Sequence, residues 1–268
     1  MKWVQFEQGG KTAFGTLDGE RITVAPGGWA DVLAGRLPGE GAQFALSEVT
    51  LLAPVARPGK IVAIGLNYMD HCRETNTEPP QRPLVFTKFT TAIAAPGQPI
   101  RWAAALTQQV DYEAELAVVI GRAARHVPER DALGYVLGYT AANDVSARDL
   151  QFSDGQWVRA KSLDTFCPLG PALVTADEIP DPQQLAIRCE LNGQRVQDSH
   201  TGEMIFPVAH LVAFCSEAFT LEPGDVILTG TPHGTGAFRT PKLFMGDGDR
   251  VAVEIERIGR LENPCEVR

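Results

Sequence analysis

The amino-acid sequence predicts an α+β fold in which strands outnumber helices and pair in antiparallel and mixed sheets. Short apolar runs bounded by Gly, Pro or Asn recur along the chain, which is typical of strands. Asn192-Gly193 separates two such runs and indicates a β-hairpin, because this dipeptide fits a two-residue hairpin turn. Helical periodicity is clear at residues 207–219, where apolar side chains recur at i, i+3, i+4 and i+7. Together these observations favour a strand-built core with few helices.

The first 50 or so residues predict a small N-terminal α+β module with Gly-rich turns. Its expected elements are strands at residues 2–6, 12–16 and 21–24 and a short helix at residues 29–34. Residues 51–60 contain two prolines and a glycine, a composition that favours a linker. We therefore predict two domains, the module at residues 1–55 and a main domain at residues 56–268.

The sequence of the main domain predicts a mixed sheet. Its expected strands lie at residues 61–64, 84–87, 116–120, 135–141, 172–175, 186–191, 225–229 and 250–258. Many of these runs are bounded by Gly, Pro or Asn-Gly, as strands commonly are. The sequence contains no internal repeat and no low-complexity tract, so we expect one strand-rich domain here.

Composition and charge argue against several classes of protein. The 268 residues are 44% apolar with a formal net charge of −9, which speaks against a nucleic-acid or anionic-membrane partner. No apolar run approaches the ~20 residues that span a bilayer, and the first ten residues lack the apolar core of a secretory signal. The five cysteines are scattered without C-x-x-C spacing, which is typical of reduced thiols. We expect a cytoplasmic protein.

Two carboxylates, Glu113 and Glu115, stand two residues apart at the start of an apolar strand. Side chains alternate along a strand, so both project from one face, roughly 6–7 Å apart. Like charges this close are unfavourable near a core unless a cation lies between them. Asp144 ends another apolar run and could supply a third oxygen. Three carboxylates without His or Cys suit Mg²⁺ or Mn²⁺; alternatively, both glutamates line the solvent face of an edge strand.

His71 and Glu74 come after the first strand of the main domain, three residues apart, so on a helical turn their side chains can touch. A carboxylate orients an imidazole and raises its basicity, which a general base for water requires. Residues 75–83 are polar and proline-rich, a composition that suits a mobile lid. The alternative is a surface salt bridge between the two side chains.

Three more side chains lie close in sequence to Asp144. Lys161 precedes a strand entry and could stabilise an enolate or carbonyl oxygen, or it could pair with Asp164 on the surface. Arg148 and Gln151 lie one and two helical turns beyond Asp144. They could hold a substrate carboxylate, support the metal ligands, or form a solvated helix face.

The Gly-rich loop at residues 229–236 comes directly after a predicted strand. It lacks the Gly-Lys-Ser/Thr ending of a phosphate loop, so we reject nucleotide binding. Its backbone N–H groups and the Thr231 hydroxyl could receive a carboxylate, or the loop could be a tight turn only.

The order of these motifs resembles the fumarylacetoacetate hydrolase superfamily, in particular its small members. The matching segments are residues 65–74, 111–121, 138–151, 159–170, 221–236 and 246–263. They span nearly everything from residue 60 to the C-terminus. The resemblance implies a strand-rich mixed β-sheet roll or sandwich of the family's C-terminal-domain type, preceded by a short N-terminal module. The chain departs from the family pattern after Lys88: relatives often have Pro followed by Ser or Thr there, whereas Phe89, Thr90 and Thr91 follow the lysine in this chain.

The resemblance also implies roles for the residues singled out above. The metal carboxylates of the family fall on Glu113, Glu115 and Asp144. Its lysine falls on Lys161, its lid pair on His71 and Glu74, and its loop threonine on Thr231. Arg148 and Gln151 join Thr231 as expected substrate-binding residues.

The activity that the resemblance implies is a metal-dependent reaction of a 2-oxo acid, with one Mg²⁺ or Mn²⁺ per chain. Our first expectation is hydrolytic C–C cleavage of an acylpyruvate-type 2,4-diketo acid through a metal-stabilised enolate. The alternatives are isomerisation or decarboxylation of an unsaturated 2-oxo dioate, as in aromatic catabolism, and ureidoglycolate lyase activity. The resemblance further suggests a homodimer.

Overall fold

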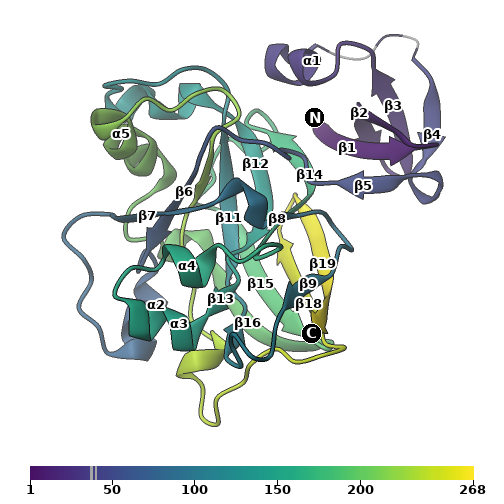
Figure 1. The fold of residues 1–268 in the computed structure, drawn as a ribbon. Helices are drawn as coiled ribbons and strands as arrows, with labels where there is room; N and C mark the ends of the chain where they lie inside the picture. Colours follow the sequence, from purple (N-terminus) through teal and green to yellow (C-terminus); the bar gives the residue numbers. More distant parts are fainter. Residues whose placement is uncertain (37–38, 40) are drawn as a thin grey trace.

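The computed structural model describes every residue except 37, 38 and 40. Figure 1 shows a strand-rich main body with the smaller N-terminal module beside it. The strands are β1 (Lys2–Gln8), β2 (Lys11–Asp18), β3 (Arg21–Ala25), β4 (Gln43–Ala45), β5 (Thr50–Leu52), β6 (Ile61–Gly65), β7 (Leu84–Lys88), β8 (Ile93–Ala94), β9 (Ile100–Trp102), β10 (Val110–Asp111), β11 (Ala114–Ile120), β12 (Val136–Asn143), β13 (Ser146–Ala147), β14 (Cys167–Thr175), β15 (Ala186–Leu191), β16 (Gln194–His200), β17 (Val226–Leu228), β18 (Arg250–Ile255) and β19 (Gly259–Val267). The α-helices are α1 (Trp29–Ala34), α2 (Met69–Thr75), α3 (Arg148–Asp154), α4 (Val158–Lys161) and α5 (Val208–Ala218).

The strands pair in three sheets, and the predicted strand-rich α+β class is confirmed. The long sheet has 12 strands, with the path β4-β3-β2-β1-β14-β12-β11-β17-β6-β7, and β5 and β8 pair at its side. A second sheet has five strands in the order β16-β15-β18-β19-β9. The short strands β10 and β13 form a ribbon of their own.

Strand β11 lies inside the long sheet and is buried on both faces. Leu116 and Val118 point into a core shared with the five-stranded sheet and α5. Ala117 and Val119 point into a second core on the opposite face. Burial on both faces explains why this strand is a continuous apolar run in sequence, without polar alternation. It also places Glu115, at the start of the strand, inside the protein.

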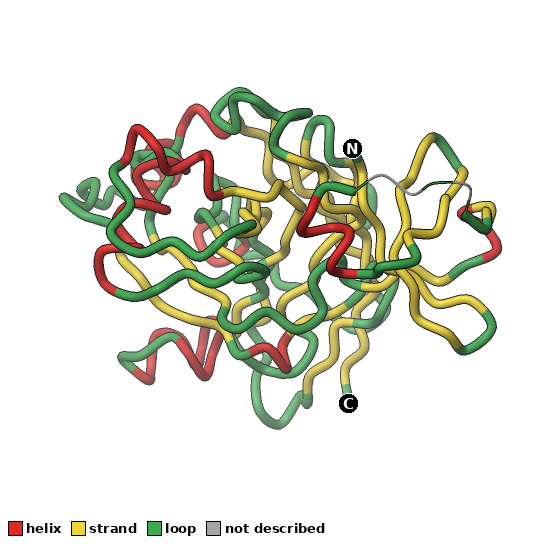
Figure 2. Tube along the Cα trace, turned by 90° about the horizontal axis from the view of Figure 1, so that it is seen from above, coloured by secondary structure: helices red, strands yellow, loops and turns green. Residues whose placement is uncertain are grey.

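The N-terminal module shares the long sheet with the main body, because β1 pairs with both β2 and β14. In Figure 2, seen from above, its strands project to one side. Our interpretation of residues 51–60 as a linker is wrong for their first part. β5 pairs with β1 there, and Ala53 and Val55 are buried. The two prolines fall after this strand, so they do not interrupt its hydrogen bonds.

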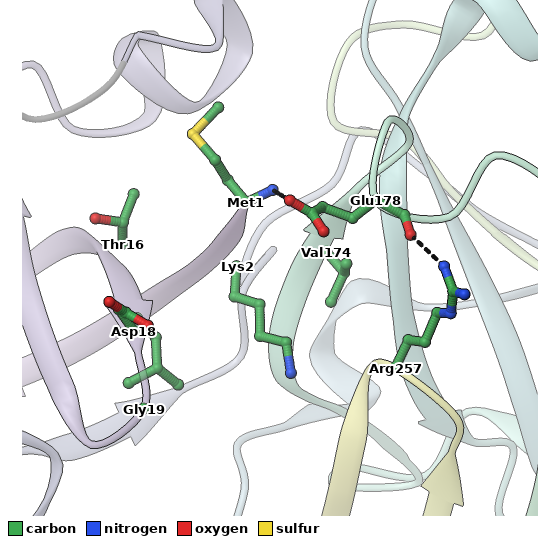
Figure 3. A pocket seen from close by; sticks show the side chains of 9 residues that line it. Met1, Lys2, Thr16, Asp18, Gly19, Val174, Glu178 and Arg257 are labelled. Carbon is green, nitrogen blue, oxygen red and sulfur yellow. Dashed lines mark hydrogen bonds and ion pairs between the residues drawn. The ribbon is translucent and has the colours of Figure 1, made fainter.

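A hollow of about 750 Å³ lies where the module meets the main body (Figure 3). The Met1 ammonium donates to the Glu178 carboxylate at 3.2 Å, and Arg257 donates to the Glu178 carbonyl oxygen at 3.0 Å. The Met1–Glu178 contact therefore joins the module to the main body. The described side chains that line the hollow include no buried cluster of acids and bases, so we look elsewhere for the chemistry.

Most predicted elements are present with shifted ends. The helix at residues 29–34 coincides with α1, and the hairpin at Asn192-Gly193 joins β15 to β16. The predicted strand at 250–258 is wrong in its last three residues, because β18 ends at Ile255. The chain turns at Arg257, which has a φ of 66°, and returns as β19. Gly259, with a φ of 125°, closes this turn, whereas Pro264 makes β19 look unlike a strand.

The helices α2, α3 and α4 gather at one end of the main body, close to β13 (Figure 1). α3 lies against α4, and α4 packs near β7 and β13. No helix among the described residues is long and apolar enough to cross a membrane. All five cysteines are free and buried.

Candidate active site and metal centre

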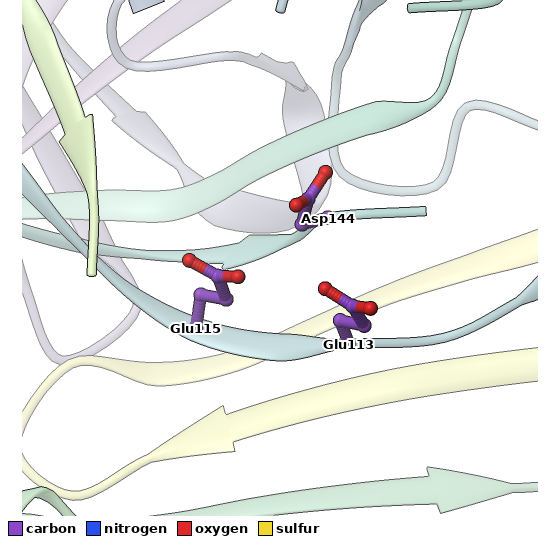
Figure 4. A group of neighbouring side chains, drawn as sticks. All are labelled: Glu113, Glu115 and Asp144. Atoms are coloured by element: carbon purple, nitrogen blue, oxygen red, sulfur yellow. The ribbon is translucent and has the colours of Figure 1, made fainter. Parts of the chain in front are cut away.

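Glu113, Glu115 and Asp144 come together at the ends of two neighbouring strands (Figure 4). One carboxylate oxygen from each lies within 4.8 Å of the others, and all three residues are buried. The register of β11 and β12 causes this, because Ala114 stands opposite Asn143. The Asp144 N–H donates to the Glu113 carbonyl oxygen at 2.9 Å, which fixes the two acids side by side. The expectation of a solvent-facing edge strand is therefore wrong.

Three buried cations surround this group of acids. Lys161 Nζ lies 2.7 Å from Glu113 Oε2 and 2.7 Å from Asp144 Oδ2. Lys88 Nζ lies 2.5 Å from the other Asp144 oxygen. Arg148 contacts the second Glu113 oxygen at 2.7 Å. Both oxygens of Glu113 and both oxygens of Asp144 are therefore held by positive charge.

The protonation of the acids is set by these contacts. Burial opposes ionisation of Glu113, but Lys161 and Arg148 outweigh it and lower the pKa of this carboxyl to about 2. Burial, Asp144 and Glu113 all raise the pKa of Glu115 well above its ordinary value, with only Lys161 and the Gly230 N–H acting against them. Burial would lower the pKa of Lys161, but Asp144 and Glu113 raise it. Glu113 and Lys161 are therefore charged at neutral pH.

The donor set fits a hard divalent cation. It consists of three buried carboxylates, and no His or Cys belongs to the group among the described residues. Among the described residues, Glu115 has no close cation partner, and its Oε2 accepts the Gly230 N–H at 2.7 Å. A bound cation would remove the repulsion that raises its pKa. Glu113, Glu115 and Asp144 can thus hold a divalent ion.

His71 and Glu74 form the predicted pair on α2. His71 Nδ1 lies 3.0 Å from Glu74 Oε2, and the Gly234 N–H donates to the other Glu74 oxygen at 2.9 Å. Although burial works the other way, the hydrogen bonds from His71 and Gly234 lower the pKa of Glu74. Because Nδ1 is engaged, Nε2 is the ring nitrogen left for a substrate.

A second contact fastens α2 to the Gly-rich loop at residues 229–236. Asp70 lies 2.9 Å from His233 Nδ1 on that loop and also accepts a hydrogen bond from Ser199. The helix is therefore held at two acids, Asp70 and Glu74, one turn apart. This keeps His71 against the cavity, where it is buried.

A cavity of about 130 Å³ joins the carboxylates to the histidine. The residues that line it are Ile64, Gly65, Leu66, His71, Phe86, Glu113, Glu115, Arg148, Gln151, Phe152, Trp157, Lys161, Thr231 and Phe238. Glu74 and Asp144 stand behind His71 and Lys161. The nine residues singled out in the sequence thus lie in or directly behind one cavity, and their roles there remain predictions.

Burial excludes the surface positions that the sequence left open for Lys161 and for the pair Arg148 and Gln151. Lys161 is only 2% exposed and is hydrogen-bonded to Glu113 and Asp144, so the surface pair with Asp164 is wrong. Arg148 and Gln151 are buried and bonded to each other at 2.9 Å, so the solvated helix face is wrong too.

Thr231 is placed by a neighbour that the sequence did not reveal. Gln197 Nε2 donates to the Thr231 hydroxyl at 2.9 Å, which leaves the hydroxyl proton of Thr231 for another acceptor. Gln197 comes from β16, and its Oε1 accepts the Ala114 N–H at the start of β11. It therefore links the Gly-rich loop to the carboxylates.

Sequence reasoning missed two charged residues of the site. The sequence draws attention to Lys88 only through the unusual residues after it, yet its side chain is fully buried against Asp144. Asp111 accepts hydrogen bonds from Arg148 Nε at 2.8 Å and from the Gly236 N–H at 2.8 Å. A charged residue at the end of an apolar strand is the signal that could have found both.

Comparisons with known proteins agree with this geometry. A family model described as fumarylacetoacetate (FAA) hydrolase C-terminal matches residues 60–266, and one described as Rv2993c-like, N-terminal, matches residues 1–54. The oxaloacetate tautomerase fahd2, mitochondrial, of Xenopus laevis is 51% identical over 220 residues, which are 81% of this chain and 69% of that protein.

Several solved structures match the whole of this chain, including the following two. The 5-carboxymethyl-2-hydroxymuconate delta-isomerase of Mycobacterium smegmatis is 40% identical, with a TM-score of 0.86 over 99% of its own chain. The fumarylacetoacetate hydrolase of Exiguobacterium antarcticum is 37% identical, with a TM-score of 0.91 over 100% of its own chain. The family model, the relatives and the buried site agree: this chain belongs to the fumarylacetoacetate hydrolase family of enzymes.

Proposed function

We propose that this protein is a divalent-cation-dependent tautomerase of small 2-oxo acids, with oxaloacetate as the first substrate to test. The reaction converts the enol to the ketone: C3 gains a proton and the enol oxygen loses one. One observation carries the proposal, namely that the His71–Glu74 pair, Lys161 and the metal carboxylates line or back a single small cavity. The tautomerase and isomerase names of similar proteins support it.

Glu113, Glu115 and Asp144 would hold the cation, which we propose is Mg²⁺ or Mn²⁺ because both accept oxygen ligands. When bound, it would supply Lewis-acid stabilisation of negative charge on the 2-oxo acid. The remaining chemistry falls to the side chains of this chain.

We assign the proton transfer to His71. Its Nε2 can deliver a proton to C3, and the ionised Glu74 stabilises the charged ring from the other side. The proton released from the enol oxygen then restores the imidazolium through solvent, so the net reaction moves one proton from oxygen to carbon. Glu74 positions the ring and does not touch the substrate.

Lys161 is placed to stabilise charge on oxygen. An ammonium group has three N–H donors, and two of them are directed at Glu113 and Asp144. The third donor is left for the oxygen of the enolate as negative charge develops.

The substrate carboxylate has two candidate partners. The Thr231 hydroxyl can donate to it, and Gln151 lines the same cavity. Arg148 directs its donors to Asp111, Gln151 and Glu113, so it holds these groups in place while adding positive charge.

The cavity of about 130 Å³ can take the 2-oxo carboxylate end of a substrate between the metal carboxylates and His71. It opens to the surface beside Phe152 and Phe238, which are exposed, so a group on C3 can extend out of it. We also propose a homodimer acting in the cytoplasm, which size-exclusion chromatography with light scattering and cell fractionation would test.

A second candidate is hydrolytic C–C cleavage of an acylpyruvate. The His71–Glu74 pair favours it, because a histidine oriented by a carboxylate can also activate water for attack on a carbonyl. The two candidates share the metal site and differ in whether water enters the products.

The experiment follows enol absorbance of oxaloacetate and of acetylpyruvate with the purified protein, with Mg²⁺, Mn²⁺ or EDTA, against rates without protein. We expect metal-dependent loss of enol oxaloacetate without cleavage products, and deuterium at C3 in D₂O. Metal-dependent formation of pyruvate and acetate from acetylpyruvate, with no acceleration of oxaloacetate, would establish the hydrolase instead. No effect on either substrate would reject both candidates.

A further inference from the structure

The mouth of the active-site cavity is built from aromatic rings, those of Phe86, Phe152, Trp157 and Phe238, which we call the aromatic mouth. We propose that the aromatic mouth makes this enzyme a tautomerase of arylpyruvates, 2-oxo acids that carry an aromatic ring on C3. This inference rests on the proposed tautomerase function and adds the substrate class. The proton balance is unchanged: C3 gains one proton and the enol oxygen loses one.

The rings are fixed by contacts with one another and with the backbone. Phe86 and Trp157 meet edge to face, with ring centroids 5.3 Å apart. Trp157 also lies directly on Gly65, where an added Cβ would stand 2.6 Å from the ring. Only glycine permits this close approach, so the backbone at the end of β6 sets the position of the tryptophan.

The aromatic rings cover the two cations of the cavity. Lys161 Nζ lies 5.4 Å from the centre of the Phe86 ring, and the Arg148 guanidinium lies 5.9 Å from that of Phe238. Both cations already face buried carboxylates. Among the described residues that line the cavity, no further Lys or Arg is present. A group on C3 that extends to the mouth would therefore meet aromatic rings and no further cation.

Two of the rings are exposed to water. Phe152 is 61% exposed and Phe238 is 40% exposed, although large apolar side chains are normally covered. Phe152 lies four residues beyond Arg148 on α3, so it stands one turn along the same face of the helix, and it lines the cavity. An aryl group attached to C3 of a substrate held by the metal site would extend towards these rings and cover them.

The test compares enol phenylpyruvate with enol oxaloacetate in the same enol-absorbance assay, with Mg²⁺ or Mn²⁺ present. The readout is the ratio of the two kcat/KM values in the wild type, Phe152→Ala and Phe152→Tyr. Phe89→Ala is the matched control, because Phe89 is 57% exposed but does not line this cavity. We expect Phe152→Ala to lower the ratio three- to tenfold, mainly through KM for phenylpyruvate, about the value of one aromatic contact. Phe152→Tyr and Phe89→Ala should keep the wild-type ratio.

Each other outcome overturns the proposal. Turnover of oxaloacetate without turnover of phenylpyruvate would reject the arylpyruvate class and leave the proposed function in place. An unchanged ratio in Phe152→Ala would remove the aromatic mouth from substrate choice. A ratio that falls only together with a change from dimer to monomer in size-exclusion chromatography would assign Phe152 to a subunit contact. Turnover of neither substrate would reject the proposed function and this inference with it.

Discussion

The floor of the cavity holds charged groups out of water, whereas its mouth holds phenylalanine rings in water. Lys88, Lys161 and Asp144 are buried at the floor, and Phe152 and Phe238 are exposed at the mouth. Both arrangements are unfavourable for folding alone, because ions lose hydration in the interior and apolar rings gain it at the surface.

The difference separates the part of the site that ion pairs hold in place from the part that a ligand could cover. At the floor, each described cation lies against an acid, so the charges are tolerated and their positions are fixed. At the mouth, Phe152 is left uncovered, and a ligand could cover it. We therefore expect floor variants to lower kcat and stability, and mouth variants to change KM and substrate choice.

The largest effect is expected for Glu113→Ala. It removes a metal ligand and leaves Lys161 and Arg148 without one of their acids, so kcat/KM should fall at least 100-fold. Breaking a buried ion pair costs about 3–5 kcal/mol, which urea unfolding would measure. Wild-type turnover in this variant would exclude Glu113 from the metal site.

His71→Ala should lower kcat by about 10²–10⁴-fold, the usual contribution of a general acid or base. The control is His210→Ala, because His210 also pairs with a carboxylate, Glu129 at 2.9 Å, but does not line the cavity. Equal kinetic losses in the two variants would contradict the assigned role.

Lys88→Met tests whether the floor depends on a cation behind the metal ligands. Asp144 would keep Lys161 but lose its second buried partner, and we expect a loss of about 3–5 kcal/mol in unfolding free energy. Arg101→Met is the control, because the Arg101–Glu266 pair is partly exposed and such pairs contribute about 1 kcal/mol or less. Similar losses in the two variants would mean that the buried Lys88–Asp144 pair stabilises the fold no more than a partly exposed pair does.

Glu74→Gln should reveal the lowered pKa of Glu74. The pKa in the fold lies below the unfolded value of about 4.3, so ionised Glu74 stabilises the fold above that pH. This stabilisation is lost as the pH falls through the folded pKa. The difference in unfolding free energy between wild type and variant should therefore be constant above about pH 5.5 and shrink below about pH 4. If the difference in unfolding free energy grew towards acid pH, the pKa of Glu74 would be raised in the fold, opposite to our expectation.

The smallest effect on stability is expected for Phe152→Ala. An exposed side chain has little packing to lose, so the unfolding free energy should change by less than about 0.5 kcal/mol. A loss of several kcal/mol would show that the ring packs against something in solution. The contrast between a buried floor and a mouth exposed to water would then no longer hold.

Much of the fold was predictable because it depends on local pattern. The helix at residues 29–34, the hairpin at Asn192-Gly193 and the apolar run of β11 each carry their own signal. The turn at Arg257 was not predictable, since a left-handed residue there is enforced by the pairing of β18 with β19. The strand pairing of residues 50–52 was hidden for the same reason, because the partner strand β1 lies far away in sequence.

By itself, the sequence determined which residue types stand at the strand ends and, through the order of its motifs, the family. Glu113 and Glu115 share a face because a strand alternates, and His71 meets Glu74 because a helix turns every 3.6 residues. Only the tertiary structure decided which of these groups share one cavity. Lys88 and Asp144 are 56 residues apart, and their contact exists because the paired strands between them fix both backbones. Local periodicity does not determine contacts between residues so far apart in sequence. Sheet register determines which backbones are neighbours, and buried charges then need partners of opposite sign.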